Sequence, residues 1–191
     1  MFLAEKGIEI PTVQVDLAAG EQRKPEFLAL NPLGAVPVLE LDDGTAIAES
    51  GAICRYIEAQ HPEPPLWGRD PVTIARVEMW HRRVELKLYL AVQDAVRNGH
   101  AAFAGSGSGP NGEQKSEVAE AGKRDAEQFC DWLDQELGAR RFVAGEAFSI
   151  ADVALLAAVD FARLAKLRLR EGRPHMGRWY DEVAARESAK A

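Results

Sequence analysis

The chain has 191 residues, of which 47% are hydrophobic and 28% are charged, and its formal net charge at pH 7 is −7. This balance is that of an ordinary globular protein, and the acidic excess argues against nucleic acid or an anionic membrane as the main partner. No apolar run approaches the ~20 residues of a membrane-spanning helix, and the opening "MFLAEKGIEI" is too short and too polar for a secretory signal. We therefore expect a cytoplasmic protein that binds neither nucleic acid nor a membrane.

The two cysteines, Cys54 and Cys130, lie far apart and belong to no Cys-x-x-Cys or Cys/His pattern. A structural zinc site or a disulfide framework is therefore not expected, and we predict no metal. Cys54 fits a small buried apolar residue better than a reactive thiol.

The first third of the chain alternates short helices and strands. Residues 1–6 are typical of a helix end stopped by Gly7, and the alternation in "TVQVD" predicts a short strand at residues 12–16. A turn of helix then ends before Pro32. The next segments are "VPVLEL" and "TAIAE", which flank Asp43-Gly44 and predict a hairpin, and a helix from residue 50 with Ala52, Ile53, Tyr56 and Ile57 facing inward.

A proline-rich segment separates this part from a helical remainder. The stretch "HPEPPLWGRDP", residues 61–71, contains four prolines and predicts a stiff linker. Beyond it the apolar spacing is helical. We expect a first domain at residues 1–62, a linker at 63–70 and an all-helical domain at 71–191. The helical domain is predicted to contain a long amphipathic helix from Ile74 to Ala95, a flexible Gly/Ser loop at 104–112, a second long helix from Val118 to Leu137, a buried central helix from Ile150 and a last helix near Met176.

Two helix starts carry polar pairs. In "FSIAD" Ser149 is a good N-cap and Asp152 stands three residues later, so the pair forms an approximate capping box with a folding role. At Glu49-Ser50, one interpretation is again a serine cap. The alternative is an anion site, in which the helix N-terminus and the Ser50 hydroxyl bind a carboxylate and Glu49 takes a ligand ammonium.

Pro37 lies at the start of an apolar strand. Proline has no N–H group to give to a sheet, so it is tolerated only in an edge strand or at the first position of a strand. An ordinary trans peptide bond is one interpretation. If the bond is cis, the Val36 N–H and C=O face a cleft, where an extended peptide ligand pairs with them by strand addition.

These motifs together resemble the cytosolic glutathione S-transferases. The resemblance rests on "NPLGAVPVLELDDG…AIAESGAICRYIE", the proline-rich segment and "FSIADV" in a helical second half, and it covers nearly the whole chain. It implies a thioredoxin-like α/β domain followed by an all-α domain, and a homodimer. It also implies a cis Pro37, a Val36 backbone that pairs with the cysteinyl part of glutathione, and Glu49 and Ser50 at the γ-glutamyl end.

The chain departs from the family pattern at its start. The family's catalytic Tyr, Ser or Cys lies between the first strand and the first helix, whereas this chain begins inside that helix. Cys54 and Tyr56 do not match the catalytic position, so the catalytic residue is expected upstream of Met1. The missing strand would pair with residues 12–16, and its loss would orphan backbone groups at about 1–3 kcal/mol each if buried. We expect that the natural polypeptide starts upstream of Met1. The alternative is a true truncation, in which the gap left by the missing strand is filled by rearrangement or by a neighbouring chain. The intact mass of the protein would distinguish the two.

The leading function is conjugation of the glutathione thiolate to a hydrophobic electrophile. Glutathione-dependent isomerase, dehalogenase or reductase chemistry on the same scaffold is a second possibility, and a non-catalytic binding or scaffold protein is a third. Trp80, Arg83 and Tyr89 are candidates for the electrophile pocket, although we favour packing in the core or a dimer interface for them.

Overall fold

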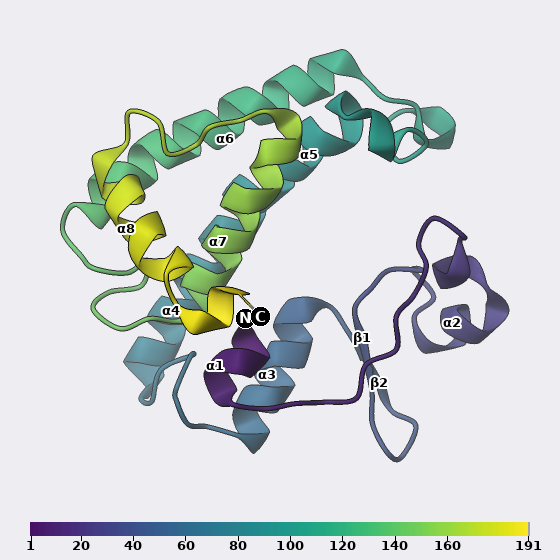
Figure 1. The fold of residues 1–191 in the computed structure, drawn as a ribbon, viewed down its shortest axis with the longest axis horizontal. Coiled ribbons are helices and arrows are strands. Elements are labelled where there is room, and N and C mark those ends of the chain that lie inside the picture. The colour runs from purple at the N-terminus through teal and green to yellow at the C-terminus, as the bar shows by residue number, and fades with distance from the viewer. Residues whose placement is uncertain (191) are drawn as a thin grey trace. The chain divides into compact units, whose positions relative to one another are not determined.

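The computed structural model describes residues 1–190, and the chain divides into two compact units, Phe2–Pro65 and the residues from Leu66 onward together with Met1. The smaller unit combines short helices with a two-stranded sheet, and the larger unit is built of helices (Figure 1). This is the fold class that the sequence predicts, a thioredoxin-like α/β unit followed by an all-helical one. Among residues 1–190, no helix has the length and apolar character needed to cross a bilayer.

The smaller unit begins with a helix that Gly7 ends, as predicted. Gly7 adopts a φ of 64°, in the left-handed region, and the Ile8 N–H then reaches back to the carbonyl of Leu3 at 3.0 Å. This is the geometry of a glycine C-cap. The elements of the unit are α1 (Phe2–Lys6), η1 (Glu21–Arg23), α2 (Pro25–Leu30), β1 (Val38–Glu40), β2 (Ala46–Ala48) and α3 (Ser50–Gln60).

The strand expected at residues 12–16 is absent. The segment forms no regular secondary structure, and Val13 is 90% exposed. In the described chain β1 and β2 pair only with each other, so no neighbouring strand supplies the ladder bonds that would make this segment part of a sheet. The inward face of α3 is also narrower than expected: Ile53 and Ile57 are buried, but Ala52 is exposed.

A buried lysine ties α1 to the end of α3. The Lys6 ammonium lies 2.5 Å from the Glu58 carboxylate, and its side chain is fully buried. It also donates to the carbonyls of His61 at 2.9 Å and Pro64 at 2.5 Å. A buried charge persists only when it is paired and hydrogen-bonded, and all three partners come from the C-terminal end of the unit.

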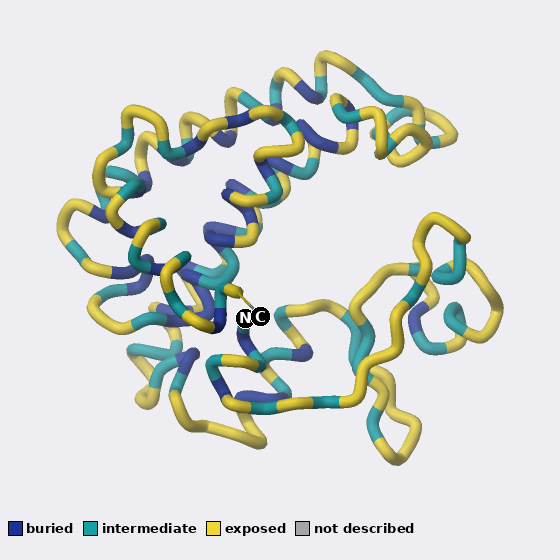
Figure 2. Tube along the Cα trace, in the orientation of Figure 1, coloured by how far each residue is buried: buried dark blue, intermediate teal, exposed yellow. Residues whose placement is uncertain are grey.

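The larger unit is organised around α7, most of whose residues are buried, as its apolar sequence predicts (Figure 2). Leu66 and Trp67 are 3% and 2% exposed, so this part of the expected linker belongs to the core of the unit. The expected long helix is continuous but contains a π-helical segment. The elements are α4 (Pro71–Arg83), the π-helical η2 (Val84–Tyr89), α5 (Leu90–Gly99), η3 (Ala101–Phe103), η4 (Pro110–Gly112), α6 (Ser116–Leu137), α7 (Ile150–Phe161), η5 (Ala162–Ala165), α8 (Pro174–Ala184) and η6 (Glu187–Lys190).

The Gly/Ser loop expected to be flexible is fastened to α5. The buried Asn98 side chain accepts from the backbone N–H groups of Ser108 at 2.9 Å and Lys115 at 3.1 Å. The loop also folds against itself so closely that a Cβ on Gly107 would lie 2.2 Å from the Glu113 carbonyl oxygen. Glycine is therefore used here for close backbone approach rather than for mobility.

Candidate functional site

Val36 and Ser50 lie at the same end of the hairpin. The antiparallel register ends at the pair Val38 and Ala48, and Val36 and Ser50 each lie two residues beyond this pair on their own side of the hairpin. Val36 is 43% exposed, and among the described residues its backbone N–H and C=O have no hydrogen-bond partner. The Val36–Pro37 peptide bond is cis. The hairpin thus presents an open backbone edge beside the start of α3.

Glu49 joins β2 to α3 in an unusual conformation. Its φ of 67° and ψ of 122° lie outside the regions that non-glycine residues normally adopt, which costs about 1–3 kcal/mol. Glu49 holds the N-cap position, and its carbonyl accepts the first helical bond from the Ile53 N–H at 2.9 Å. Strain of this kind concentrates at ligand sites.

Ser50 is the first residue of α3 and not its cap. Neither Ser50 nor Glu49 makes a side-chain capping bond, so the interpretation of Ser50 as an ordinary N-cap is wrong. Ser50 is exposed, and its hydroxyl is available beside the unpaired N–H groups of the first helical turn. Sequence reasoning missed the left-handed Glu49, because nothing in the residue type signals it.

The charges at this end of the hairpin suit a small zwitterion. The α3 N-terminus carries about half a positive charge and attracts a carboxylate, while the exposed Glu49 carboxylate attracts an ammonium group. A free backbone edge of this kind is the geometry to which an extended peptide adds as a strand. Val36, Pro37, Glu49 and Ser50, the four predicted site residues, thus lie together on one unit.

The neighbouring thiol is not poised to react. Burial raises the pKa of Cys54 to about 11, so its thiol is protonated at neutral pH and a poor nucleophile. Burial likewise raises the pKa of Cys130 to about 12. Among residues 1–190 no group of His, Cys, Asp or Glu side chains is arranged to hold a metal ion.

The helical candidates for an electrophile pocket are packed against aromatic neighbours. Trp80 is 2% exposed and stacks on Trp132 with ring centroids 5.4 Å apart. The Arg83 guanidinium lies 4.7 Å from the Trp80 ring centroid. Tyr89 stacks on Phe161 at 5.9 Å. Trp80 is therefore a core residue of the larger unit, while Arg83 and Tyr89 are half-buried.

The two units match two family models in chain order. Residues 1–60 match the glutathione S-transferase N-terminal domain, and residues 116–182 match the glutathione S-transferase C-terminal domain. Glutathione S-transferase 2 of Saccharomyces cerevisiae is 39% identical over 192 residues, which span 98% of this chain and 80% of the yeast protein. The chain belongs to the glutathione S-transferase family.

Solved structures of the family agree with this assignment. The crystal structure of Gtt2 from Saccharomyces cerevisiae superposes with a TM-score of 0.88 at 37% identity, covering 99% of this chain and 90% of the yeast chain. A relative with another name matches a shorter part of this chain. Maleylacetoacetate isomerase of Pseudomonas aeruginosa is 43% identical over 76 residues, or 39% of this chain and 36% of the isomerase.

Proposed function

We propose that this family member binds glutathione at the end of the hairpin. In this proposal the Val36 backbone, beside Pro37, pairs with the cysteinyl part of glutathione, and Glu49 and Ser50 bind the ammonium and carboxylate of its γ-glutamyl end. The observation that carries the proposal is the open Val36 backbone at the end of the hairpin from which α3 starts, a helix start that no side chain caps. Glutathione is an extended zwitterionic peptide, so its groups complement these donors and acceptors.

We further propose that the bound thiol is transferred to a hydrophobic electrophile. As a thiolate, the glutathione sulfur forms a bond to an electrophilic carbon, the leaving group departs with its electron pair, and the thiol proton passes to solvent. No Ser, Tyr or Cys precedes Gly7, and Cys54 holds its proton. Neither the first helix nor Cys54 therefore supplies the group that activates the thiol.

The binding step is tested with the double variant Glu49→Ala/Ser50→Ala. Titration calorimetry with glutathione should show affinity falling at least about tenfold, the equivalent of one charge-assisted hydrogen bond. The fold should persist, since the structure contains no capping bond from either side chain to lose. Asp42→Ala/Thr45→Ala, at the turn end of the same hairpin, is the matched control and should bind normally. Unchanged affinity in the Glu49/Ser50 variant would refute the site.

The reaction is tested separately from binding. If the protein joins glutathione to an aromatic halide, which is measured as the release of halide ion, the transferase proposal is supported. Binding without turnover favours the scaffold alternative. Turnover of a glutathione-dependent isomerisation, without thioether formation, favours the isomerase alternative, which the likeness to maleylacetoacetate isomerase supports. Reductive dehalogenase or reductase chemistry would appear as glutathione disulfide among the products, because reduction of the substrate oxidises two glutathione molecules.

We also propose that the protein is a cytoplasmic homodimer. The family resemblance supports the dimer, and the net charge of −7 suits a soluble protein of that compartment. Light scattering after size exclusion should give twice the mass of one chain, and a monomer at micromolar concentration would refute the dimer.

A further inference from the structure

The chain contains three asparagines, Asn31, Asn98 and Asn111, and the last two are each followed by glycine. In an Asn-Gly pair the backbone nitrogen of the glycine can attack the side-chain amide of the asparagine, because no Cβ hinders the approach. Asn31 is followed by Pro32, whose nitrogen has no hydrogen to give up. Two positions therefore remain at which an asparagine can close into a ring with its own backbone.

Asn98 is locked against this reaction. It is 4% exposed, and its amide nitrogen donates to the Asp94 carbonyl at 3.1 Å and to the Ser108 hydroxyl at 3.0 Å. Its amide oxygen accepts the N–H groups of Ser108 and Lys115, and Gly99 is the last residue of α5. Turning the amide toward the Gly99 nitrogen would leave all these buried partners without a hydrogen bond.

Asn111 has the opposite surroundings. It is exposed and adopts a φ of 55° and a ψ of 27° inside η4, a left-handed conformation that costs energy for a residue with a Cβ. Among residues 1–190 its side-chain amide has no hydrogen-bond partner. The Gly112 N–H makes one bond, to the Gly109 carbonyl at 3.1 Å. Opening this single turn releases the nucleophile, and such local openings in loops are the least costly in a protein.

The Asp43-Gly44 turn of the hairpin is protected by charge. Ring closure at an aspartate proceeds from the neutral acid, because a carboxylate has no good leaving group. Hydrogen bonds from the Thr45 hydroxyl and N–H lower the pKa of Asp43, so this side chain is ionised at neutral pH. Asn111 is thus the position where sequence, exposure and free groups coincide.

We propose that Asn111 is a self-modification site, at which the chain converts its own side-chain amide to an acid. The Gly112 nitrogen forms a bond to Cγ of Asn111, the bond from Cγ to the amide nitrogen breaks, and ammonia leaves with the proton of the Gly112 N–H. Water then opens the five-membered imide at one of its two carbonyls. One opening gives aspartate, and the other gives isoaspartate, in which the backbone runs through Cβ. The reaction needs no glutathione and no second copy of the chain.

The isoaspartate does not fit the folded loop. The Gly107 N–H donates to the Gly112 carbonyl at 2.9 Å, and the Gly109 N–H donates to the Glu113 carbonyl at 2.8 Å. A Cβ on Gly112 would lie 2.0 Å from the Gly105 carbonyl oxygen, so there is no room for an additional backbone carbon directly before Gly112. The loop therefore has to open when isoaspartate forms. Each chain then carries a negative charge and a loosened loop that record its age.

The site is tested by incubating the full chain at mildly alkaline pH and mapping its peptides by mass spectrometry. In the folded chain Asn111 should convert at least about tenfold faster than Asn98, because Asn98 reacts only after a buried helix end opens. In urea the two should convert at similar rates, since both precede glycine. Equal rates at the two positions in the folded chain, or conversion of Asn111 in urea alone, would overturn the proposal.

The opening of the loop is tested with Asn111→Asp, which adds the charge but keeps the backbone length. The Gly107 and Gly109 amides should keep their protection from hydrogen exchange in this variant and lose it at least about tenfold in the isoaspartate fraction separated from aged protein. Asn111→Gln is the control that should stay unmodified, because its longer side chain would have to close a larger ring. Equal protection in the Asn111→Asp and isoaspartate forms would show that the loop accommodates the additional carbon and would refute the opening.

Discussion

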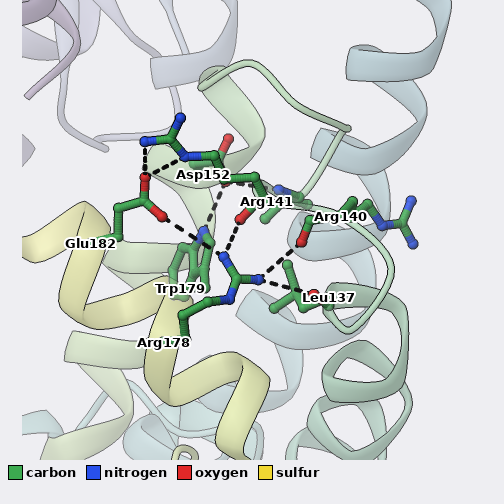
Figure 3. Close-up of polar contacts among 8 residues, drawn as sticks. Leu137, Arg140, Arg141, Asp152, Arg178, Trp179 and Glu182 are labelled. Atoms are coloured by element: carbon green, nitrogen blue, oxygen red, sulfur yellow. Dashed lines mark hydrogen bonds and ion pairs between the residues drawn. The ribbon is translucent and has the colours of Figure 1, made fainter.

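The indole nitrogen of Trp179 lies 2.8 Å from Oδ1 of Asp152, which joins α8 to the first turn of α7 (Figure 3). The same carboxylate accepts the N–H groups of Val143 and Ser149, each at 2.9 Å, and the Ser149 hydroxyl at 3.0 Å. Asp152 is 0% exposed. One side chain thus holds the loop before α7, the start of α7 and α8 in a single arrangement.

Asp152→Ala should lower the free energy of unfolding by about 3 kcal/mol or more. The substitution leaves the Trp179 and Val143 N–H groups buried without an acceptor, at about 1–3 kcal/mol each, and removes the bonds to Ser149. Urea denaturation followed by circular dichroism measures the change. A loss below 1 kcal/mol would mean that water replaces the carboxylate.

The stability contributed by Asp152 should depend on pH. Burial raises its pKa from 3.8 to about 6, against the four donors that favour the ionised form. Between these pH values the folded chain keeps a proton that the unfolded chain has lost. The stabilising contribution is therefore complete below pH 3.8 and is lost as the pH rises through about 6, by on the order of 3 kcal/mol. The measurement is the free energy of unfolding of the wild type and of the Asp152→Asn variant, which does not titrate at this position. The difference between the two should fall as the pH rises through this window. A difference that does not change with pH would contradict the assignment of the pH dependence to Asp152.

Arg178→Met should destabilise the protein by about 1–2 kcal/mol. The guanidinium of Arg178 donates to the carbonyls of Leu137 and Arg140, each at 2.9 Å, and of Arg141 at 2.8 Å (Figure 3). These carbonyls belong to the last residue of α6 and to the segment just after it, where helical partners run out and a positive charge is favoured. Arg178→Lys should not rescue fully, because an ammonium lacks the planar fork. Thermal unfolding compared with Arg141→Met, which loses mainly an exposed ion pair to Glu182, gives the control.

Gly122→Ala should destabilise the protein although it improves helix propensity. A Cβ at this position would lie 2.4 Å from the Ala91 carbonyl oxygen and 2.9 Å from the Ala95 nitrogen, so α5 and α6 would have to separate, at about 1–3 kcal/mol. Gly177→Ala in α8 meets nothing within 4 Å and should stabilise by about 0.5–1 kcal/mol. Changes of the same sign in the two variants would refute the close helix contact.

In the Lys6→Met variant, the smaller unit should unfold more readily than in the wild type. It leaves the Glu58 carboxylate and the carbonyls of His61 and Pro64 without the buried ammonium, a loss of about 3–5 kcal/mol for a broken buried pair. Adding Glu58→Gln should recover part of the loss. The measurement is denaturation of both variants, and additive losses would show that the two side chains are not coupled.

Local sequence patterns predicted the elements that need only local interactions. Gly7 ends α1, and Asp152 binds the Ser149 N–H at the start of α7, because both signals act within a few residues. Strand alternation at residues 12–16 failed, since a strand forms only with a neighbour to pair with. The partners of Asp152 in the loop and in α8 come from distant positions, which no spacing in the sequence encodes.

The candidate site was predicted by residue but not by conformation. The sequence pointed to Glu49 and Ser50, with a Ser50 cap as one of two interpretations, whereas the left-handed Glu49 takes the N-cap position. Such a conformation is imposed by the surrounding fold and not by the residue type. The Gly/Ser loop illustrates the converse, because its composition suggested mobility and Asn98 fixes it.

The sheet of the smaller unit, with three residue pairs between β1 and β2, is shorter than an isolated hairpin needs for stability in water. A ligand that joins the Val36 backbone to the start of α3 would close the free end of that hairpin. Ligand binding and ordering of the hairpin are then linked equilibria. Above the dissociation constant, each tenfold increase in ligand concentration raises the free energy of local opening of the hairpin by about 1.4 kcal/mol. Protection of the hairpin amides from hydrogen exchange would then follow the ligand concentration.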